Sequence, residues 1–284
     1  MPTFPRYLRA YWQLLRLEHG VMYGLGVLAG VYVADPSFSD VETLILAFLT
    51  ALLFQASTFA LNDYFDYEVD VANRRLDRPL VRGDIERIRA LQISLILFPL
   101  GCITSYKISP QAFAFAFAVS ILGVAYNVKL KEFGLAGNVY IAFSMSAPFL
   151  FGSIVATSKI VGTSAIMAAI AFLSGLGREI MKGIEDVKGD ALRNVRSVAR
   201  VKGEEFAAKA AAALYISAVA LSPLPLIYEE YVDVKYVFPV AVCDALILSA
   251  AVRLLRDFEN IPELRRRTLI AMFFGLVAFL AGAF

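Results

Sequence analysis

Long apolar runs recur along the whole chain, and they constrain its fold more than any other feature. An α-helix needs about 20 apolar residues to cross the hydrocarbon core of a bilayer. Of the 284 residues, 59% are hydrophobic and only 18% are charged, which is unusual for a soluble protein of this length. The sequence therefore predicts an all-α, polytopic membrane protein. The net charge of +2 gives no indication of a nucleic-acid partner.

Nine apolar runs, each bounded by charged residues, Pro or Gly, are expected to form membrane-spanning helices. Their expected limits are residues 17–34, 41–61, 88–106, 111–126, 136–156, 161–178, 209–228, 236–254 and 266–284. Residues 1–16 precede the first run and mix arginines with aromatic residues. They predict an amphipathic helix that lies in the membrane interface rather than across it.

The distribution of positive charge predicts the orientation of these spans. With nine helices, 24 of the 27 Lys and Arg residues fall on the side that holds the N-terminus. The other three, Lys107, Lys159 and Lys235, fall on the opposite side. Because basic residues concentrate on the cytoplasmic side of membrane proteins, we expect a multi-pass protein of the cell membrane. Its N-terminus would be cytoplasmic and its C-terminus outside.

Two polar connectors are long and begin with acidic residues. They cover residues 62–87 and 179–208, follow the second and sixth spans, and are both predicted to be cytoplasmic. In the first, Asn62, Asp66 and Asp70 are spaced i, i+4, i+8 and would share one helix face. In the second connector, Asp186 and Asp190 are again four residues apart, and Glu179 and Lys182 lie on nearly the same face.

Clustered carboxylates near a bilayer need a compensating charge. Like charges at i, i+4 destabilise a helix, and an ionised Asp costs more as it approaches the hydrocarbon core. Oxygen ligands without His or Cys suit Mg²⁺, which substrate phosphates commonly help to hold. Two such clusters predict two or more Mg²⁺ ions that hold a diphosphate. Basic residues on the same side that could contact its oxygens are Arg74, Arg75, Arg78, Arg82, Lys129, Lys131 and Lys182.

Simpler interpretations apply to several single residues. Any one Arg beside a cytoplasmic helix end could form a solvated salt bridge. His19, the only histidine, fits a headgroup-facing position better than a metal site. Tyr64 and Phe65 fit helix packing better than the wall of a substrate channel. The two cysteines, Cys102 and Cys243, lie in apolar segments and predict neither a disulfide nor a zinc site.

The segment NDYFDYEVDVANRRLDRPL resembles the first signature of the UbiA superfamily of intramembrane prenyltransferases, N-D-x-x-D-x-x-x-D followed by an Arg-Pro step. The segment REIMKGIEDVKGD resembles the second signature, D-x-x-x-D, and YNVKLK lies between the two. The resemblance covers essentially the whole chain. It implies one integral membrane prenyltransferase domain over residues 1–284, with nine helices around a central cavity and active-site loops at 62–87 and 179–208.

The resemblance also implies roles for particular residues. Mg²⁺ would be bound by Asn62, Asp66, Asp70, Asp186 and Asp190. The diphosphate would be bound by Arg16, Arg75, Arg78, Lys129, Lys131 and Lys182, with Tyr126 near the leaving group. The residues implied to act most directly in catalysis are Asp66, Asp186, Lys182 and Tyr126.

The implied reaction is transfer of a polyprenyl group, expected to be geranylgeranyl, from its diphosphate to a lipid-soluble acceptor in the membrane. The second signature is most similar to a subgroup whose acceptor is geranylgeranylglyceryl phosphate, a precursor of archaeal ether lipids. An aromatic acceptor, as in quinone or haem O biosynthesis, is the alternative within the family. A hydroxyl acceptor needs a proton acceptor, for which Asp63 and Glu179 are candidates. A membrane transporter is the alternative of another class, although transporter carboxylates usually lie near the bilayer midplane.

Overall fold

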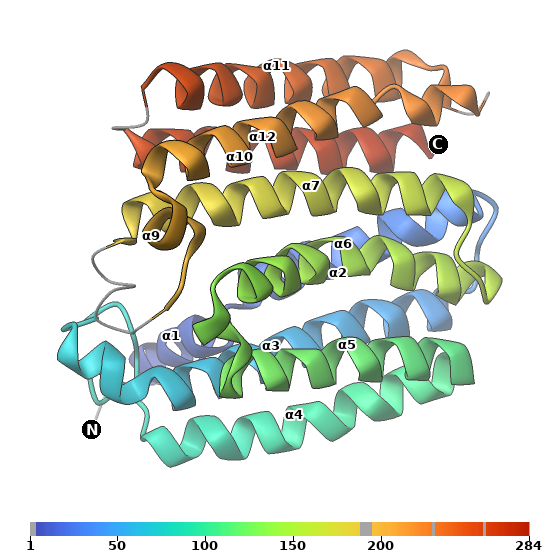
Figure 1. Cartoon of the computed structure of the whole chain (residues 1–284). Coiled ribbons are helices and arrows are strands. Elements are labelled where there is room, and N and C mark those ends of the chain that lie inside the picture. Colours follow the sequence, from blue (N-terminus) through green and yellow to red (C-terminus); the bar gives the residue numbers. More distant parts are fainter. Residues whose placement is uncertain (1–3, 188–194, 229–230, 258–259, 284) are drawn as a thin grey trace. The chain divides into compact units, whose positions relative to one another are not determined.

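The computed structural model describes residues 4–187, 195–228, 231–257 and 260–283, and all regular structure in these ranges is helical (Figure 1). The expectation of an all-α fold is therefore confirmed. The elements are α1 (Phe4–Leu15), α2 (Leu17–Ala34), α3 (Val41–Ala72), α4 (Arg87–Ile108), α5 (Pro110–Val128), η1 (Leu130–Phe133), α6 (Leu135–Thr157), α7 (Gly162–Glu185), α9 (Val198–Lys202), α10 (Glu204–Leu221), η2 (Leu224–Ile227), α11 (Val234–Arg256) and α12 (Ile261–Gly282).

Eight segments within the described ranges are long and apolar enough to cross a membrane. They are α2 to α7, α11, and the segment Glu204–Ile227 that contains α10 and η2. The ninth predicted span corresponds to α12, whose first turns carry Arg265, Arg266 and Arg267, so that its uninterrupted apolar part begins only at Thr268. The chain is thus a multi-pass membrane protein with eight clear candidate spans.

Two helices extend into segments that the sequence predicted to be connectors. Helix α3 continues past Leu61 to Ala72, and α7 continues past Glu179 to Glu185. No Gly or Pro interrupts residues 62–72, so nothing in the backbone ends the helix where the apolar run ends. The first acidic motif therefore lies on a helix, and the connector that follows it begins only at Asn73.

The described residues form two compact units, and the first contains Met1–Val27 and Ser39–Val128. In this unit α3, α4 and α5 pack side by side, and α1 packs against α3 (Figure 1). Ser57 of α3 donates a 3.0 Å hydrogen bond to the carbonyl oxygen of Ser94 in α4. Near the first motif, an apolar cluster joins α1 and α3 to the connector, and it contains Ala10, Leu14, Ala60, Leu80, Ile85 and Ala90.

The second unit contains Leu28–Phe38 and Lys129–Phe284. Helix α7 packs against α6, α10 and α12, and α11 packs against α10 and α12. The apolar side chains at the C-terminal end of α7 are buried in the core of this unit. They belong to Ile180, Met181 and Ile184 and pack in one cluster with the buried Tyr215 of α10. The opposite face of the same turns carries the polar residues of the second motif. The first unit therefore carries its acidic motif on the end of α3, and the second carries Glu179 and Lys182 on the end of α7.

Helix α1 is observed where residues 1–16 were predicted to form an amphipathic helix. Ala10 and Leu14 are buried, whereas Leu8 and Trp12 are 58% and 51% exposed. Exposed apolar and aromatic side chains on a helix that also carries arginines are typical of a helix in the headgroup region. The interfacial position of α1 remains a prediction.

Candidate active site

The first motif occupies the last turns of α3. Asn62 and Asp66 are half-buried on this helix, and Asp63 and Asp70 are buried. Successive residues on a helix are 100° apart, so Asp63 lies beside the row formed by the other three rather than opposite it. The motif therefore presents two adjoining polar surfaces, one centred on Asp63 and one on Asn62 and Asp66.

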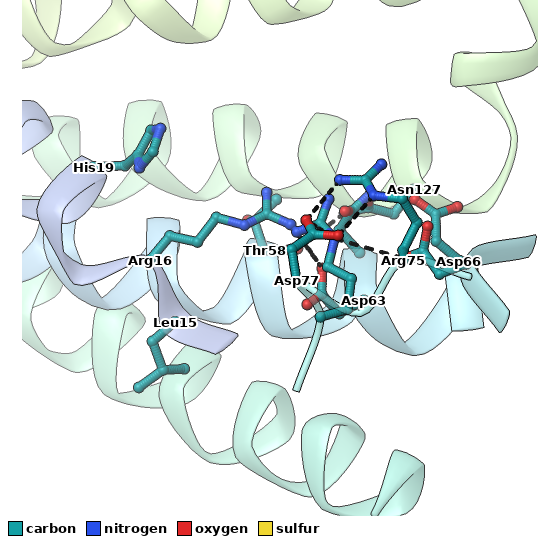
Figure 2. Close-up of polar contacts among 12 residues, drawn as sticks. Leu15, Arg16, His19, Thr58, Asp63, Asp66, Arg75, Asp77 and Asn127 are labelled. Carbon is teal, nitrogen blue, oxygen red and sulfur yellow. Dashed lines mark hydrogen bonds and ion pairs between the residues drawn. The ribbon is translucent and has the colours of Figure 1, made fainter. Parts of the chain in front are cut away.

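Asp63 is the centre of a buried ion-pair cluster (Figure 2). Its Oδ1 accepts a hydrogen bond from Nη2 of Arg16 at 2.7 Å and lies 3.4 Å from Nη1 of Arg78. The Asp63 side chain is 1% exposed, and the Arg16 and Arg78 side chains are only 16% and 20% exposed. Such buried groups require each other, because a buried charge without its partner is costly. Asp63 is thus placed to orient two guanidinium groups.

Arg16 reaches Asp63 from the junction of α1 and α2. Its backbone φ of 45° is left-handed, which is uncommon for a residue other than Gly and bends the chain between the two helices. Its guanidinium also lies over the ring of Phe59, 4.1 Å from the ring centre. Burial lowers the pKa of Arg16 to about 10, and the nearby Asp63 carboxylate opposes this shift. Arg16 therefore remains a cation at neutral pH.

Asn62 and Asp66 are joined to Asn127, which was not among the predicted site residues. Asn62 Nδ2 lies 3.0 Å from Asp66 Oδ2 and 3.0 Å from Oδ1 of Asn127. Asn127 lies near the end of α5 and is 1% exposed. Figure 2 shows Asn127 and Asp66 in the same group of polar residues as Asp63. An isolated Asn in an apolar helix was the only available signal for this residue.

Two arginines of the connector after α3 form ion pairs with carboxylates. Arg75 makes a bidentate pair with Asp77, with N–O distances of 2.9 and 2.8 Å. The hydrogen bond from Arg75 lowers the pKa of Asp77 to about 2, so this carboxylate is ionised at neutral pH. Nε of Arg78 lies 3.7 Å from Asp70, which brings Asp70 to the Asp63 cluster. The structure thus joins three predicted residues, Arg16, Arg78 and Asp70, around Asp63.

The YNVKLK element lies where the two units meet in the sequence. Tyr126 is half-buried in the last turn of α5, beside Asn127. Lys129 is exposed, and its ammonium group lies 3.0 Å from Glu132. Lys131 lies in the short helix η1 and is half-buried. Each of the three keeps the role implied by the family resemblance as a prediction.

The second motif is built around Glu179 of α7. Lys182 Nζ lies 3.0 and 2.8 Å from the two Glu179 carboxylate oxygens. Arg178 lies 3.6 Å from Glu179, with a side chain that is 16% exposed. Asp186 is exposed and directly follows the last residue of α7. Its backbone N–H donates a hydrogen bond to the carbonyl oxygen of Lys182. The other predicted ligand, Asp190, lies outside the described residues.

The two motifs share a pattern of ion pairs. In each unit one largely buried carboxylate, Asp63 or Glu179, contacts two basic side chains. Each of these carboxylates also lies seven residues before an Asp of its motif. Arg178 is the second basic partner of Glu179 and was not among the predicted residues. Its position directly before Glu179, in an otherwise apolar helix, could have indicated it. Both candidate proton acceptors are therefore engaged in ion pairs.

The ligand chemistry of the first motif fits Mg²⁺. Its donors are an amide oxygen and carboxylate oxygens, which Mg²⁺ prefers over nitrogen or sulfur. Within the described ranges, no three or more His, Cys, Asp or Glu side chains converge closely enough to hold a metal alone. Mg²⁺ usually takes one or two carboxylates and completes its shell with water and substrate phosphates. The motif therefore fits a cation shared with a phosphorylated ligand.

These observations define a multi-pass, helical membrane protein with an acidic helix face beside largely buried arginines. The sequence profile of the UbiA prenyltransferase family matches residues 24–277. The chain is 58% identical to a protein from Archaeoglobus fulgidus named digeranylgeranylglyceryl phosphate synthase, over 100% of this chain and 98% of the relative. A Pyrococcus furiosus protein of the same name is 33% identical, over 97% of this chain and 98% of its own. The chain belongs to the UbiA prenyltransferase family.

Solved structures agree with this assignment. One is described as giving structural and mechanistic insights into the biosynthesis of digeranylgeranylglyceryl phosphate synthase in membranes. It matches with a TM-score of 0.82 and 30% identity, over 98% of both chains. A UbiA homolog from Archaeoglobus fulgidus bound to DMAPP and Mg²⁺ matches with a TM-score of 0.73 at 20% identity, over 96% of this chain and 97% of that one. The second likeness shows the shared fold.

Proposed function

We propose that this protein transfers a geranylgeranyl group from its diphosphate to geranylgeranylglyceryl phosphate and so forms digeranylgeranylglyceryl phosphate. One observation carries the proposal: 58% identity over the full chain to a relative with the corresponding name. The motif residues of that reaction class are present in both units. A transporter is not favoured, because the family is one of prenyltransferases.

The cation in this proposal is Mg²⁺, held from the protein side by oxygen ligands. Asn62 and Asp66 are the ligands with the best support, because their side chains are already joined by a hydrogen bond at the end of α3. The remaining proposed ligands are Asp70, Asp186 and Asp190. When bound, Mg²⁺ would neutralise negative charge on the departing diphosphate.

The proposed diphosphate-binding residues differ in whether they must first leave a carboxylate partner. Arg16 and Arg78 are held in place by Asp63 and can donate to phosphate oxygens without a change of partner. Arg75 and Lys129 are paired with Asp77 and Glu132, so each would have to exchange a carboxylate for a phosphate. Lys131 and Lys182 complete the proposed set, with Tyr126 near the leaving group.

The proposed reaction breaks the allylic C–O bond, and the bonding electron pair leaves with the diphosphate. Fixed cations lower the barrier because they stabilise charge that develops on the leaving oxygen. The acceptor hydroxyl oxygen then bonds to the allylic carbon and loses its proton. The products are an ether, diphosphate and one proton. We assign Asp63 and Glu179 the task of orienting basic side chains, because both already contact two such groups.

We also propose nine spans, with α12 as the ninth, a cytoplasmic N-terminus and an external C-terminus. In this orientation both acidic motifs face the cytoplasm, and α1 lies in the cytoplasmic interface. The excess of basic residues on that side supports the orientation. The two substrates would keep their prenyl chains in the membrane, and membrane lipids surround the protein.

Labelling of single cysteines tests this orientation. In a background without Cys102 and Cys243, we expect Lys107→Cys in intact cells to react with a thiol reagent that cannot cross membranes. Asn73→Cys should react only after the cells are opened, because it caps α3 next to the first motif. Lys107→Ala should retain near wild-type transfer. The reverse labelling pattern would overturn the orientation.

The proposed function is tested with purified protein, Mg²⁺ and radiolabelled geranylgeranyl diphosphate. Geranylgeranylglyceryl phosphate is supplied in one reaction, and 4-hydroxybenzoate or dihydroxynaphthoate in others. We expect label to move onto the glyceryl phosphate alone and to require Mg²⁺. Transfer only to an aromatic compound would instead assign the enzyme to quinone-type biosynthesis.

A further inference from the structure

We infer that Asn127 is a positioning residue that fixes which end of the Asn62 amide faces the cation. The inference rests on the proposed function in one respect, namely that Asn62 contributes a ligand to Mg²⁺. A metal can be bound by the amide oxygen of Asn but not by its NH₂ group, whose lone pair is delocalised into the carbonyl group and which acts only as a hydrogen-bond donor. The orientation of this amide therefore decides whether Asn62 can be a ligand at all.

The orientation of Asn127 follows from its backbone partners. Asn127 Nδ2 lies 3.2 Å from the carbonyl oxygen of Thr58 and 3.1 Å from that of Gly123. Carbonyl oxygens only accept hydrogen bonds, so both contacts require the NH₂ end of Asn127. Its Oδ1 must then point the other way, toward Asn62. Because Asn127 is 1% exposed, water cannot readily replace these bonds.

Asn62 is oriented in turn by two acceptors. Its Nδ2 donates to Asn127 Oδ1 and to Asp66 Oδ2, each at 3.0 Å. These two bonds use both amide hydrogens. A rotation of the amide by 180° would place its oxygen against two other oxygens, which is unfavourable. The Asn62 oxygen is therefore not used in either contact and stays at the other end of the amide.

Two features make Asn127 a useful orienting group. It is anchored on α5, whereas Asn62 and Asp66 are on α3, so the orientation depends on the packing of two helices and not on one flexible side chain. Its amide bonds to Asn62 and to two backbone carbonyl oxygens, so it would act on the cation through Asn62. Groups of this kind commonly change metal affinity about 10- to 100-fold when they are removed.

A double-mutant cycle with Asn127→Leu tests the inference. We expect Asn127→Leu to weaken binding of Mg²⁺, measured by calorimetry with inorganic pyrophosphate present, by about 10- to 100-fold. In an Asn62→Ala background, where no amide is left to orient, the same substitution should change the affinity by less than about threefold. A general structural defect would weaken binding equally in both backgrounds.

Ser120→Ala is the matched control. Ser120 is buried on α5, two turns before Asn127, and its hydroxyl donates to the backbone oxygen of Ala116. We expect wild-type affinity for Mg²⁺ in this variant. If Asn127→Leu does not fold, Asn127→Ser provides the same comparison with a smaller side chain.

The outcomes separate this inference from the proposed function. Equal losses in the wild-type and Asn62→Ala backgrounds, or no loss in either, would overturn the inference and leave geranylgeranyl transfer untouched. A loss confined to the wild-type background supports it, even if the acceptor proves to be aromatic, because the binding measurement contains no acceptor.

Discussion

Asp66→Asn is expected to reduce geranylgeranyl transfer by at least about 100- to 1,000-fold while the protein remains folded. The substitution keeps the shape of the side chain and removes one negative charge from the end of α3. Loss of a cation ligand would remove several kcal/mol of transition-state stabilisation, and each 1.4 kcal/mol corresponds to about a tenfold change in rate. Asp66 is half-buried, so its neutral replacement should cost little stability. The measurements are transfer of radiolabel and the midpoint of thermal unfolding in detergent.

Glu68→Gln is the control for this prediction. Glu68 is on the same turn of α3 and loses the same charge, but its side chain is 72% exposed and contacts Arg87 at 2.9 Å. Exposed ion pairs contribute little stability. We expect near wild-type transfer and stability in this variant. A folded Asp66→Asn protein with transfer similar to that of Glu68→Gln would exclude Asp66 as a cation ligand.

Asp63→Asn is expected to produce the largest loss of stability among the motif substitutions. It leaves Arg16 and Arg78, whose side chains are only 16% and 20% exposed, without the carboxylate that they share. Breaking a buried ion pair in this way costs about 3–5 kcal/mol. For a chain of this size, the thermal midpoint should fall by about 10 °C. Asp63→Asn combined with Arg16→Gln should recover part of the loss, because it removes the cation that Asp63 contacts most closely.

A second buried carboxylate provides the comparison. The Asp84 side chain is 4% exposed and is also paired with two arginines, Arg6 and Arg82. Their side chains are 59% and 27% exposed, so water can hydrate them when the carboxylate is neutralised. Asp84→Asn should therefore cost less, about 1 kcal/mol. Equal losses for Asp63→Asn and Asp84→Asn would show that burial of the two guanidinium groups is unimportant.

The sequence predicted the positions of eight apolar helices well and the ends of those helices less well. Residues 17–34 were predicted as one span, and α2 covers Leu17–Ala34. The second span was expected to end at residue 61, but α3 continues to Ala72. Hydropathy reports where a chain can leave the hydrocarbon core, whereas a helix ends where its backbone bonding is interrupted. In α3 the interruption is at Asn73 and Arg74, and Arg74 has a φ of 50°.

The site was predictable wherever spacing along one helix was sufficient. The row of Asn62 and Asp66 follows from helical periodicity and is observed as a hydrogen-bonded pair. The pairing of Arg16 with Asp63, 47 residues apart, depends on how α1 and α3 pack and could not be obtained from spacing. Asn127 was missed for the same reason, since an Asn in an apolar helix gives no indication of its partner on another helix.

The length of α3 has a consequence for how this enzyme should be studied. Its 32 residues extend about 48 Å, whereas the hydrocarbon core of a bilayer is about 30 Å thick. In the proposed function, the polar end of this helix meets substrate headgroups at the surface while their chains remain dissolved among lipids. The relevant substrate concentration is then a mole fraction within the bilayer. Added inert lipid should slow the reaction at constant total substrate, because it dilutes the substrate within the bilayer. Kinetic constants expressed per volume of solution would then depend on the amount of lipid as well as on the protein.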